Sequence, residues 1–340
     1  MDLYLIGDAG LPNPRGEPVL QALEKAVGSD PERTFVVFLG DNVYPNGLVD
    51  TAGATRREGE RILNAQVDAL LGAHTRGIII PGNHDWAAWG PTGWDAMVRE
   101  QRYVDARGKG TVRVLPAGGC PGPEVLDFGN DLRLIVLDTQ WWLHEYAKPQ
   151  GSSSPCATKT EAQVVDSIRG ALRDAGPRAT VVVGHHPLVT GGEHGGYFDW
   201  PTYLFPFHPW ARQAGFFAQQ DVTGTNYRKM IARFTQAFHD HPPLVYAAGH
   251  EHNLQVFRRD PARYMVVSGG GIYGHTSQVR AITGTQYARR ASGFMRMSVL
   301  KDGRIRLAVI VVDAAGKAAE NFSMWLERPL GVPAASTKPE

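Results

Sequence analysis

The chain has 340 residues, which is enough for one large α/β domain or for two smaller ones. Its 35 basic and 34 acidic side chains leave a net charge of +1, so no overall field favours nucleic acid or an anionic membrane as a partner. No apolar run approaches the ~20 residues of a transmembrane helix, and no signal peptide is visible after Met1. The sequence does not indicate an oligomeric state.

Alternating apolar runs and amphipathic patterns indicate the secondary structure. Strands are predicted over 3–6, 34–39, 77–80, 132–137, 179–183, 243–248 and 264–268. Helices are predicted over 17–27, 56–71 and 161–172, the last with Thr160 as its N-cap. Strands over 294–300 and 304–312 flank a hairpin turn at Asp302–Gly303. The order predicts one layered α/β domain over 1–328, followed by a loose Pro/Ala/Ser-rich tail over 329–340.

The two cysteines, Cys120 and Cys156, both lie in Gly/Pro/Ser-rich stretches. One disulfide between two loops and two free thiols are equally compatible with this placement. Neither cysteine has the C-x-x-C spacing of a thiolate metal site, so we expect no such site.

Polar side chains follow five of the predicted strands at the points where the strands end. They are Asp8, Asp41 with Tyr44, Asn83 with His84, His185 with His186, and His250 with His252. Because α/β sheets place their chemistry at the carboxyl ends of strands, we expect these side chains to meet. Carboxylate and amide oxygens mixed with imidazoles suit iron, manganese or zinc. The set exceeds what one ion needs, which predicts two metal ions ~3.5–4 Å apart that share one carboxylate.

Each motif taken singly has a more common structural interpretation. Asp8 alone suits a turn or a helix cap, Asn83–His84 after Gly82 suits a tight turn, and a single Gly-His suits a surface histidine. Five such motifs in a consistent order, each after an apolar strand, favour the metal site over the structural interpretation.

Together these motifs resemble those of the calcineurin-like metallophosphoesterases. They read Gly7-Asp8-Ala9-Gly10, Gly40-Asp41-Asn42-Val43-Tyr44, Gly82-Asn83-His84-Asp85, Gly184-His185-His186-Pro187 and Gly249-His250-Glu251-His252. The first motif lacks the Asp-x-His of most of that superfamily, and the second carries Tyr44; both features resemble the purple acid phosphatase branch. Glu193-His194-Gly195 and the run 249–255 look like its small, tartrate-resistant type. The resemblance covers residues 1–275.

The resemblance implies a four-layer αββα sandwich, in which two mixed β-sheets pack face to face between helices and the metals lie at one edge. It implies two metal ions, Fe(III) at the tyrosine site and a divalent Fe, Zn or Mn ion beside it. The implied ligands are Asp8, Tyr44 and His252 for the first ion, Asn83, His185 and His250 for the second, and Asp41 as the bridge. It also favours a secreted or periplasmic location.

The implied activity is that of an acid phosphatase-type phosphomonoesterase, in which a metal-bound hydroxide attacks a small phosphorylated substrate. Asn83, His84 and His194 are expected to bind the substrate. His84, oriented by Asp85, and His194 are also candidates to protonate the leaving oxygen, as is His186. For His186 and His194 a supporting role behind the ligands is the equal alternative. A phosphodiesterase or nucleotide pyrophosphatase on the same scaffold, or a non-catalytic binding module, are the alternative functions.

Three further segments carry weaker signals. The glycine loop 269–271, with Tyr273 and His275 after it, is interpreted as a turn in preference to a pocket wall. The aromatic insertion within 194–227 is interpreted as a lid over the site, with a packed loop or a partner surface as alternatives. Asn321-Phe322-Ser323 is interpreted as a chance glycosylation sequon in a strand-like stretch. Asn42 is expected to hold its turn through its side-chain amide.

Overall fold

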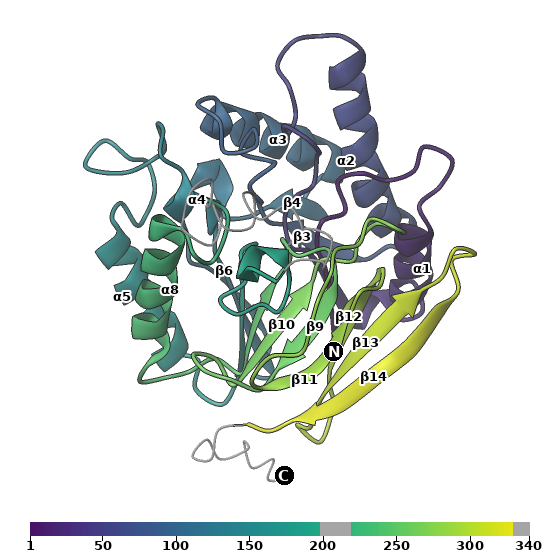
Figure 1. The fold of residues 1–340 in the computed structure, drawn as a ribbon, viewed down its shortest axis with the longest axis vertical. Coiled ribbons are helices and arrows are strands. Elements are labelled where there is room, and N and C mark those ends of the chain that lie inside the picture. The colour runs from purple at the N-terminus through teal and green to yellow at the C-terminus, as the bar shows by residue number, and fades with distance from the viewer. Residues whose placement is uncertain (198–218, 329–340) are drawn as a thin grey trace.

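A computed structural model describes residues 1–197 and 219–328 of the chain (Figure 1). Most of the aromatic insertion that we interpreted as a lid, and the whole predicted C-terminal tail, lie outside these residues.

Two mixed seven-stranded sheets form the centre of the molecule. The first runs in the order β14, β13, β12, β1, β2, β3, β4, with bounds Ala318–Leu326, Ile305–Val312, Gly293–Val299, Asp2–Ile6, Thr34–Phe38, Arg76–Ile79 and Val112–Val114. The second runs β11, β9, β10, β8, β7, β6, β5, with bounds Thr285–Arg289, Leu254–Phe257, Tyr264–Ser268, Val245–Ala248, Ala179–Val183, Leu132–Val136 and Glu124–Phe128. Within the first sheet β1 to β4 are parallel, and within the second β6, β7, β8 and β10 are parallel.

Helices flank the sheets on their outer faces (Figure 1). Contacts with the first sheet come from α1 (Pro18–Val27), α2 (Ala54–Gly72) and α3 (Gly93–Gly108). The helices α4 (Gln140–Leu143), α5 (Glu161–Arg173) and α8 (Thr225–Phe238) pack together on the other side, where Phe234 of α8 lies against Tyr246 of β8. Three short 3-10 turns cover Pro31–Arg33, Ala117–Gly119 and Glu193–Gly195. Within the described residues no helix is both long and apolar enough to cross a membrane.

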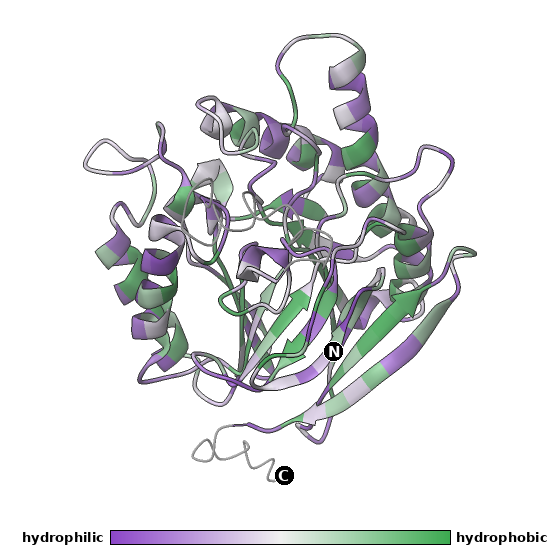
Figure 2. Cartoon of the chain, in the orientation of Figure 1, coloured by the Kyte–Doolittle hydropathy of each residue, from purple (hydrophilic) through white to green (hydrophobic). Residues whose placement is uncertain are grey.

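Successive side chains along the strands point to opposite faces of the sheets and so belong to two separate hydrophobic cores. On β1, Leu3 and Leu5 belong to the cluster between the sheets, whereas Tyr4 and Ile6 belong to the cluster under the helices. Strands buried on both faces must be apolar at every position, and Figure 2 shows the central strands as largely hydrophobic. Burial of each such side chain contributes about 1.5–3 kcal/mol, so the two cores hold the strand ends in place.

The predicted fold class is confirmed: two mixed sheets lie face to face between helices. The Thr160 cap is also confirmed, since its hydroxyl accepts from the Gln163 amide at 3.3 Å. The hairpin at Asp302–Gly303 closes with the Leu300 amide donating to Arg304 O at 2.9 Å. The helices α3, α4 and α8 and the strands β4, β5, β9, β11 and β14 were not predicted. Among these strands β4 has only three residues, and exposed or partly exposed positions along β5, β11 and β14 leave no clear apolar run.

The cysteines are joined. Cys120 and Cys156 form a disulfide with their Cα atoms 5.6 Å apart. The bond links the loop after Ala117–Gly119 to the loop that leads into α5. It decides between the two alternatives that the sequence left open.

Candidate metal centre

The predicted strand-end residues lie at one edge of the double sheet. Asp8 follows β1, Asp41 follows β2, Asn83 follows β3, His185 follows β7 and His250 follows β8. Each of these strands runs parallel to its neighbour in the list within its own sheet. Their carboxyl ends therefore fall at the same edge, and the packing of the sheets brings both sets together.

Three of these residues adopt a left-handed backbone conformation. The φ angles are 59° at Asp8, 56° at Asp41 and 70° at His250. Non-glycine residues adopt this region at a cost, and such positions cluster at functional sites. A neighbouring glycine is required by close approach, because a Cβ on Gly82 would lie 2.3 Å from Oδ1 of Asp41. These backbone conformations direct the side chains of Asp8, Asp41 and His250 toward one another.

The first group of donors surrounds a phenol. The Oη atom of Tyr44 lies 3.1 Å from Oδ1 of Asp8, 3.1 Å from Oδ2 of Asp41 and 3.1 Å from Nε2 of His252. Two carboxylates, a phenol and an imidazole from three separate segments thus meet within hydrogen-bond distance of the phenol oxygen.

The second group surrounds an amide oxygen. Oδ1 of Asn83 lies 3.0 Å from Nε2 of His185 and 3.0 Å from Nδ1 of His250. The outer nitrogens of both rings donate to backbone carbonyls at 2.8 Å, His185 to Leu39 and His250 to Gln220. Such bonds set the tautomer and turn the inner nitrogen of each ring toward the group as an acceptor, which is the form that binds a metal.

Asp41 reaches both groups. Its Oδ2 atom is 3.1 Å from the phenol oxygen of Tyr44 and 3.4 Å from Nε2 of His185. A carboxylate in this position can contact an ion in either group.

The local charge balance calls for a cation. Asp8 and Asp41 are only 1% and 2% exposed, and among the described residues neither forms an ion pair with a lysine or arginine. Burial raises the pKa of Asp8 well above its usual value. Burial acts to lower the pKa of His185, but the Asp41 and Asp8 carboxylates outweigh it and raise that pKa to about 9. Buried carboxylates beside imidazoles fit metal ions such as iron, zinc or manganese.

Three further histidines pack on the rings of these donors. The His84 ring lies 4.4 Å from that of Tyr44, His194 lies 3.9 Å from His250, and His275 lies 4.1 Å from His252, measured between centroids. The first two were candidates from the sequence. His275 had been interpreted as part of a turn, because only its place after the Gly269–Gly271 loop connected it to the site.

Asp85 does not orient His84, contrary to our expectation. Its carboxylate accepts from the backbone amides of Gly82, Asn42 and Val43 at 2.7, 2.8 and 3.1 Å. His84 instead donates from Nδ1 to Pro45 O at 2.5 Å. Since Asp85 is fully buried, its carboxylate serves the loop backbone and not the exposed ring.

His186 is also fully buried. Its Nδ1 atom is 2.8 Å from the Thr139 hydroxyl and its Nε2 atom is 2.8 Å from Oε1 of Gln220. Burial lowers its pKa well below the usual value. With both ring nitrogens engaged, this neutral ring has the geometry of a supporting residue behind His185, and not that of a proton donor.

Gln220 and Asp221 were missed by the sequence analysis. Asp221 accepts from Nδ1 of His194 at 2.7 Å, and Gln220 contacts His186 and His250 as described above. No motif surrounds these two residues. Their position within the insertion 194–227, shortly after its aromatic residues, was the only available signal.

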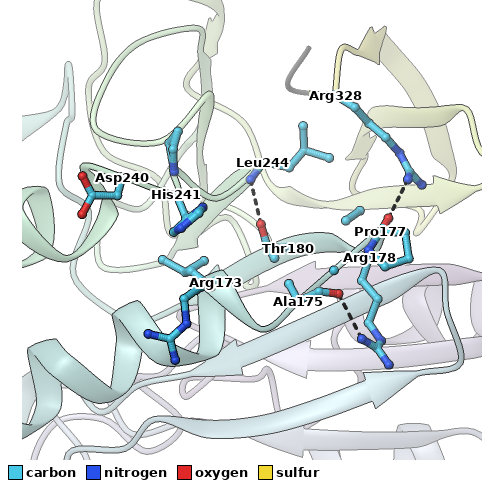
Figure 3. A pocket seen from close by; sticks show the side chains of 13 residues that line it. Arg173, Ala175, Pro177, Arg178, Thr180, Asp240, His241, Leu244 and Arg328 are labelled. Carbon is cyan, nitrogen blue, oxygen red and sulfur yellow. Dashed lines mark hydrogen bonds between the residues drawn. The ribbon is translucent and has the colours of Figure 1, made fainter. Parts of the chain in front are cut away.

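A cavity of about 280 Å³ lies at the other end of the second sheet (Figure 3). Its walls include Thr180 and Leu244, at the start of β7 and just before β8, so the metal-ligand candidates lie beyond the far ends of these strands. In Figure 3 the Arg328 guanidinium donates to Pro177 O at 2.9 Å, and Arg178 donates to Ala175 O at 3.0 Å. These arginines hold the loop before β7.

Comparisons with known proteins agree with this fold. No curated protein sequence matches the chain. One similar solved structure is GAP50, described as the anchor in the inner membrane complex of Plasmodium, at 15% identity and a TM-score of 0.61, covering 99% of this chain and 92% of that one. Another is the purple acid phosphatase PPD1 from yellow lupin (Lupinus luteus) seeds, at 15% identity and a TM-score of 0.60, covering 95% of this chain and 53% of that one.

At 15% identity these likenesses show the fold alone. The family model of the calcineurin-like phosphoesterases, by contrast, matches residues 1–254, well over half of the chain. The matched region contains all of the strand-end donors described above. The chain therefore belongs to the calcineurin-like phosphoesterase family, and its clustered aspartates and histidines support a metal-dependent phosphoesterase.

Proposed function

We propose that the protein is a phosphomonoesterase of the purple acid phosphatase branch with a two-metal centre. The observation that carries this proposal is the position of the Tyr44 phenol, which lies 3.1 Å from three other donor atoms of the site. A phenol at such a point is a natural ligand for a trivalent iron.

Each of the two groups of donors, the one around the Tyr44 phenol and the one around the Asn83 amide oxygen, is proposed to bind one ion. Asp8, Tyr44 and His252 bind Fe(III), because anionic oxygens stabilise a trivalent ion. Asn83, His185 and His250 are neutral donors and bind a divalent Fe, Zn or Mn ion, which keeps more of its Lewis acidity. Asp41 bridges, and the short distances from its Oδ2 to both groups support this role. When bound, the ions supply Lewis acidity toward the phosphate and lower the pKa of water.

The candidate histidines His84 and His194 are exposed enough to meet a substrate. The side chains of His84 and His194 are 24% and 26% exposed, whereas His186 is 0% exposed. Together with Asn83, these two bind the phosphate oxygens, and His194 protonates the leaving oxygen as the P–O bond breaks. His186 orients its neighbours and does not touch the substrate.

The test is metal analysis with a visible spectrum of protein purified without added metal. We expect iron in the protein and a tyrosinate–Fe(III) charge-transfer band that disappears in Tyr44→Phe. Tyr103→Phe is the control, because that hydroxyl bonds Asn64 on α2 and lies in a different part of the fold. A colourless protein with two equivalents of zinc or manganese would exclude the purple acid phosphatase branch, but it would still agree with a metal-dependent phosphoesterase.

The substrate class has its own test. We expect faster cleavage of nitrophenyl phosphate than of bis-nitrophenyl phosphate. Faster cleavage of the diester would favour the phosphodiesterase or nucleotide pyrophosphatase alternative.

The likeness to an anchor protein raises a second candidate, a non-catalytic binding role on the same fold. The complete donor set argues against it. Failure to bind metal and to cleave either ester would favour it.

A further inference from the structure

The segment Gln220–Val222, in the last part of the insertion 194–227, contacts the histidines around the candidate metal centre. The Gln220 carbonyl accepts from Nε2 of His250 at 2.8 Å, and its side-chain oxygen lies 2.8 Å from Nε2 of His186. The Val222 amide donates to the His194 carbonyl at 3.0 Å. Asp221, between them, accepts from Nδ1 of His194 at 2.7 Å.

The backbone of His194 is held independently of Asp221. Its amide donates to Oε1 of Glu251 at 3.0 Å, and the preceding Glu193 amide donates to Oε2 at 3.1 Å. The two contacts fix where the side chain begins. They leave the orientation of the ring open, since a half-turn about the last side-chain bond exchanges Nδ1 with Cδ2 and Nε2 with Cε1.

The Asp221 carboxylate resolves this choice. It is 4% exposed, and the His194 ring that it binds also stacks on His250 at 3.9 Å with 31° between the planes. With Nδ1 turned to Asp221, a proton that passes between this ring and a substrate must do so at Nε2. His84 is held differently, by the neutral carbonyl of Pro45. His84 and His194 therefore differ in the partner at Nδ1, which is a carbonyl for His84 and a carboxylate for His194; the Asp41 carboxylate lies 4.0 Å from Nε2 of His84.

We propose that Asp221 is a positioning residue that presents Nε2 of His194 to the leaving oxygen of the substrate. This inference rests on the proposed function. The buried carboxylate holds the ring in this one orientation, so the role follows from the contact between Asp221 and Nδ1 of His194. Misplacing a reacting group by about 1 Å can cost 100-fold in rate, so the contact matters for turnover.

A double-mutant cycle tests the proposal through kcat and KM. We expect Asp221→Ala to lower kcat about 10- to 100-fold with nitrophenyl phosphate, as is typical for residues that orient a site. In His194→Ala the same change should alter kcat by less than about threefold, because Asp221 acts through the missing ring. The loss should be larger with glycerol phosphate, since an alkoxide leaving group needs protonation more than nitrophenolate does.

Asp221→Asn is a conservative variant that controls for misfolding, because it keeps the size of the side chain and one acceptor oxygen. We expect it to lie between wild type and Asp221→Ala in kcat. Asp240→Ala is the matched control: this aspartate also lies 2.8 Å from Nδ1 of a histidine, His239, but both are exposed and distant from the metal centre. Wild-type kcat in Asp221→Ala, or equal losses with and without His194, would overturn the proposal.

A second readout separates this inference from the proposed function. In ¹⁵N-histidine-labelled protein supplied with zinc, the Nδ1 proton of His194 should give a downfield signal that is absent in His194→Ala and in Asp221→Ala and present in Asp240→Ala. Loss of the signal only in the first two variants supports the positioning contact even if the wild type cleaves no ester, a result that would overturn the proposed function alone. A signal unchanged in Asp221→Ala would overturn the positioning role.

Discussion

Asn42 and Asp85 are joined by two hydrogen bonds of 2.8 Å, one from the backbone amide and one from the side-chain amide of Asn42. The same side-chain amide also donates to Ile80 O at 2.9 Å, which confirms the expected role of Asn42 in holding its turn. Asp85 thus ties the loop after β3 to the loop that carries Asp41 and Tyr44. The buried pair therefore fixes the relative positions of two loops that carry candidate metal ligands.

Removal of this carboxylate should destabilise the fold. We expect Asp85→Ala to lower the free energy of unfolding by about 3 kcal/mol, because the amides of Gly82, Asn42 and Val43 would lose their acceptor. Urea unfolding followed by circular dichroism measures this. Asp313→Ala is the control, since Asp313 also accepts from two backbone amides but is exposed. Equal losses in both variants would contradict the prediction.

The proposed bridging role of Asp41 predicts a distinct metal stoichiometry. Asp41→Ala should lose both ions, because one side chain serves both donor groups. His252→Ala and His250→Ala should each lose about one ion per chain, since each belongs to one group. Mass spectrometry of the metals in dialysed protein measures the ratio. One ion retained in Asp41→Ala, at the level of the histidine variants, would exclude the bridge.

His144 predicts a pH dependence of stability in mildly acidic solution. Burial and then the nearby Lys148 ammonium lower the pKa of His144 to about 4, below the value of about 6.5 in an unfolded chain. Between these values the unfolded chain binds the proton more readily than the folded one. The stabilisation is therefore fully present above pH ~6.5 and is lost as the pH falls toward ~4.

We expect wild-type protein to lose on the order of 2 kcal/mol more than His144→Gln between pH 7 and pH 4. Urea unfolding at a series of pH values measures the difference. His239→Gln serves as the control, because His239 is 82% exposed. Parallel pH curves for wild type and His144→Gln would exclude this residue as the cause.

The disulfide predicts a redox-dependent stability. Cys120 and Cys156 are 36 residues apart in the sequence, and a closed loop of this length stabilises a fold by about 3–4 kcal/mol. The double variant Cys120→Ser/Cys156→Ser should lose about this amount in urea unfolding. Wild type in a strong thiol reductant should approach the variant, whereas the variant itself should not respond to the reductant. A variant as stable as oxidised wild type would contradict the estimate.

Much of the candidate site was visible in the sequence because of where its residues lie along the chain. Asp8, Asp41, Asn83, His185 and His250 each follow an apolar strand, and parallel strands bring their ends to one edge whatever the other details of the fold. Asp221 and His275 follow no such rule. They reach the site from loops, whose course local periodicity does not predict.

The sequence by itself determined the strands that carry the site, the layered α/β class and the residues at the strand ends, because apolar periodicity and strand-end chemistry are local properties. The tertiary structure alone decided that Cys120 and Cys156 are bonded and that Asp85 binds the Asn42 turn and not His84. It also decided that Asp221 meets His194. These contacts join residues that are 36, 43 and 27 positions apart in the sequence, so no local window along the chain contains them.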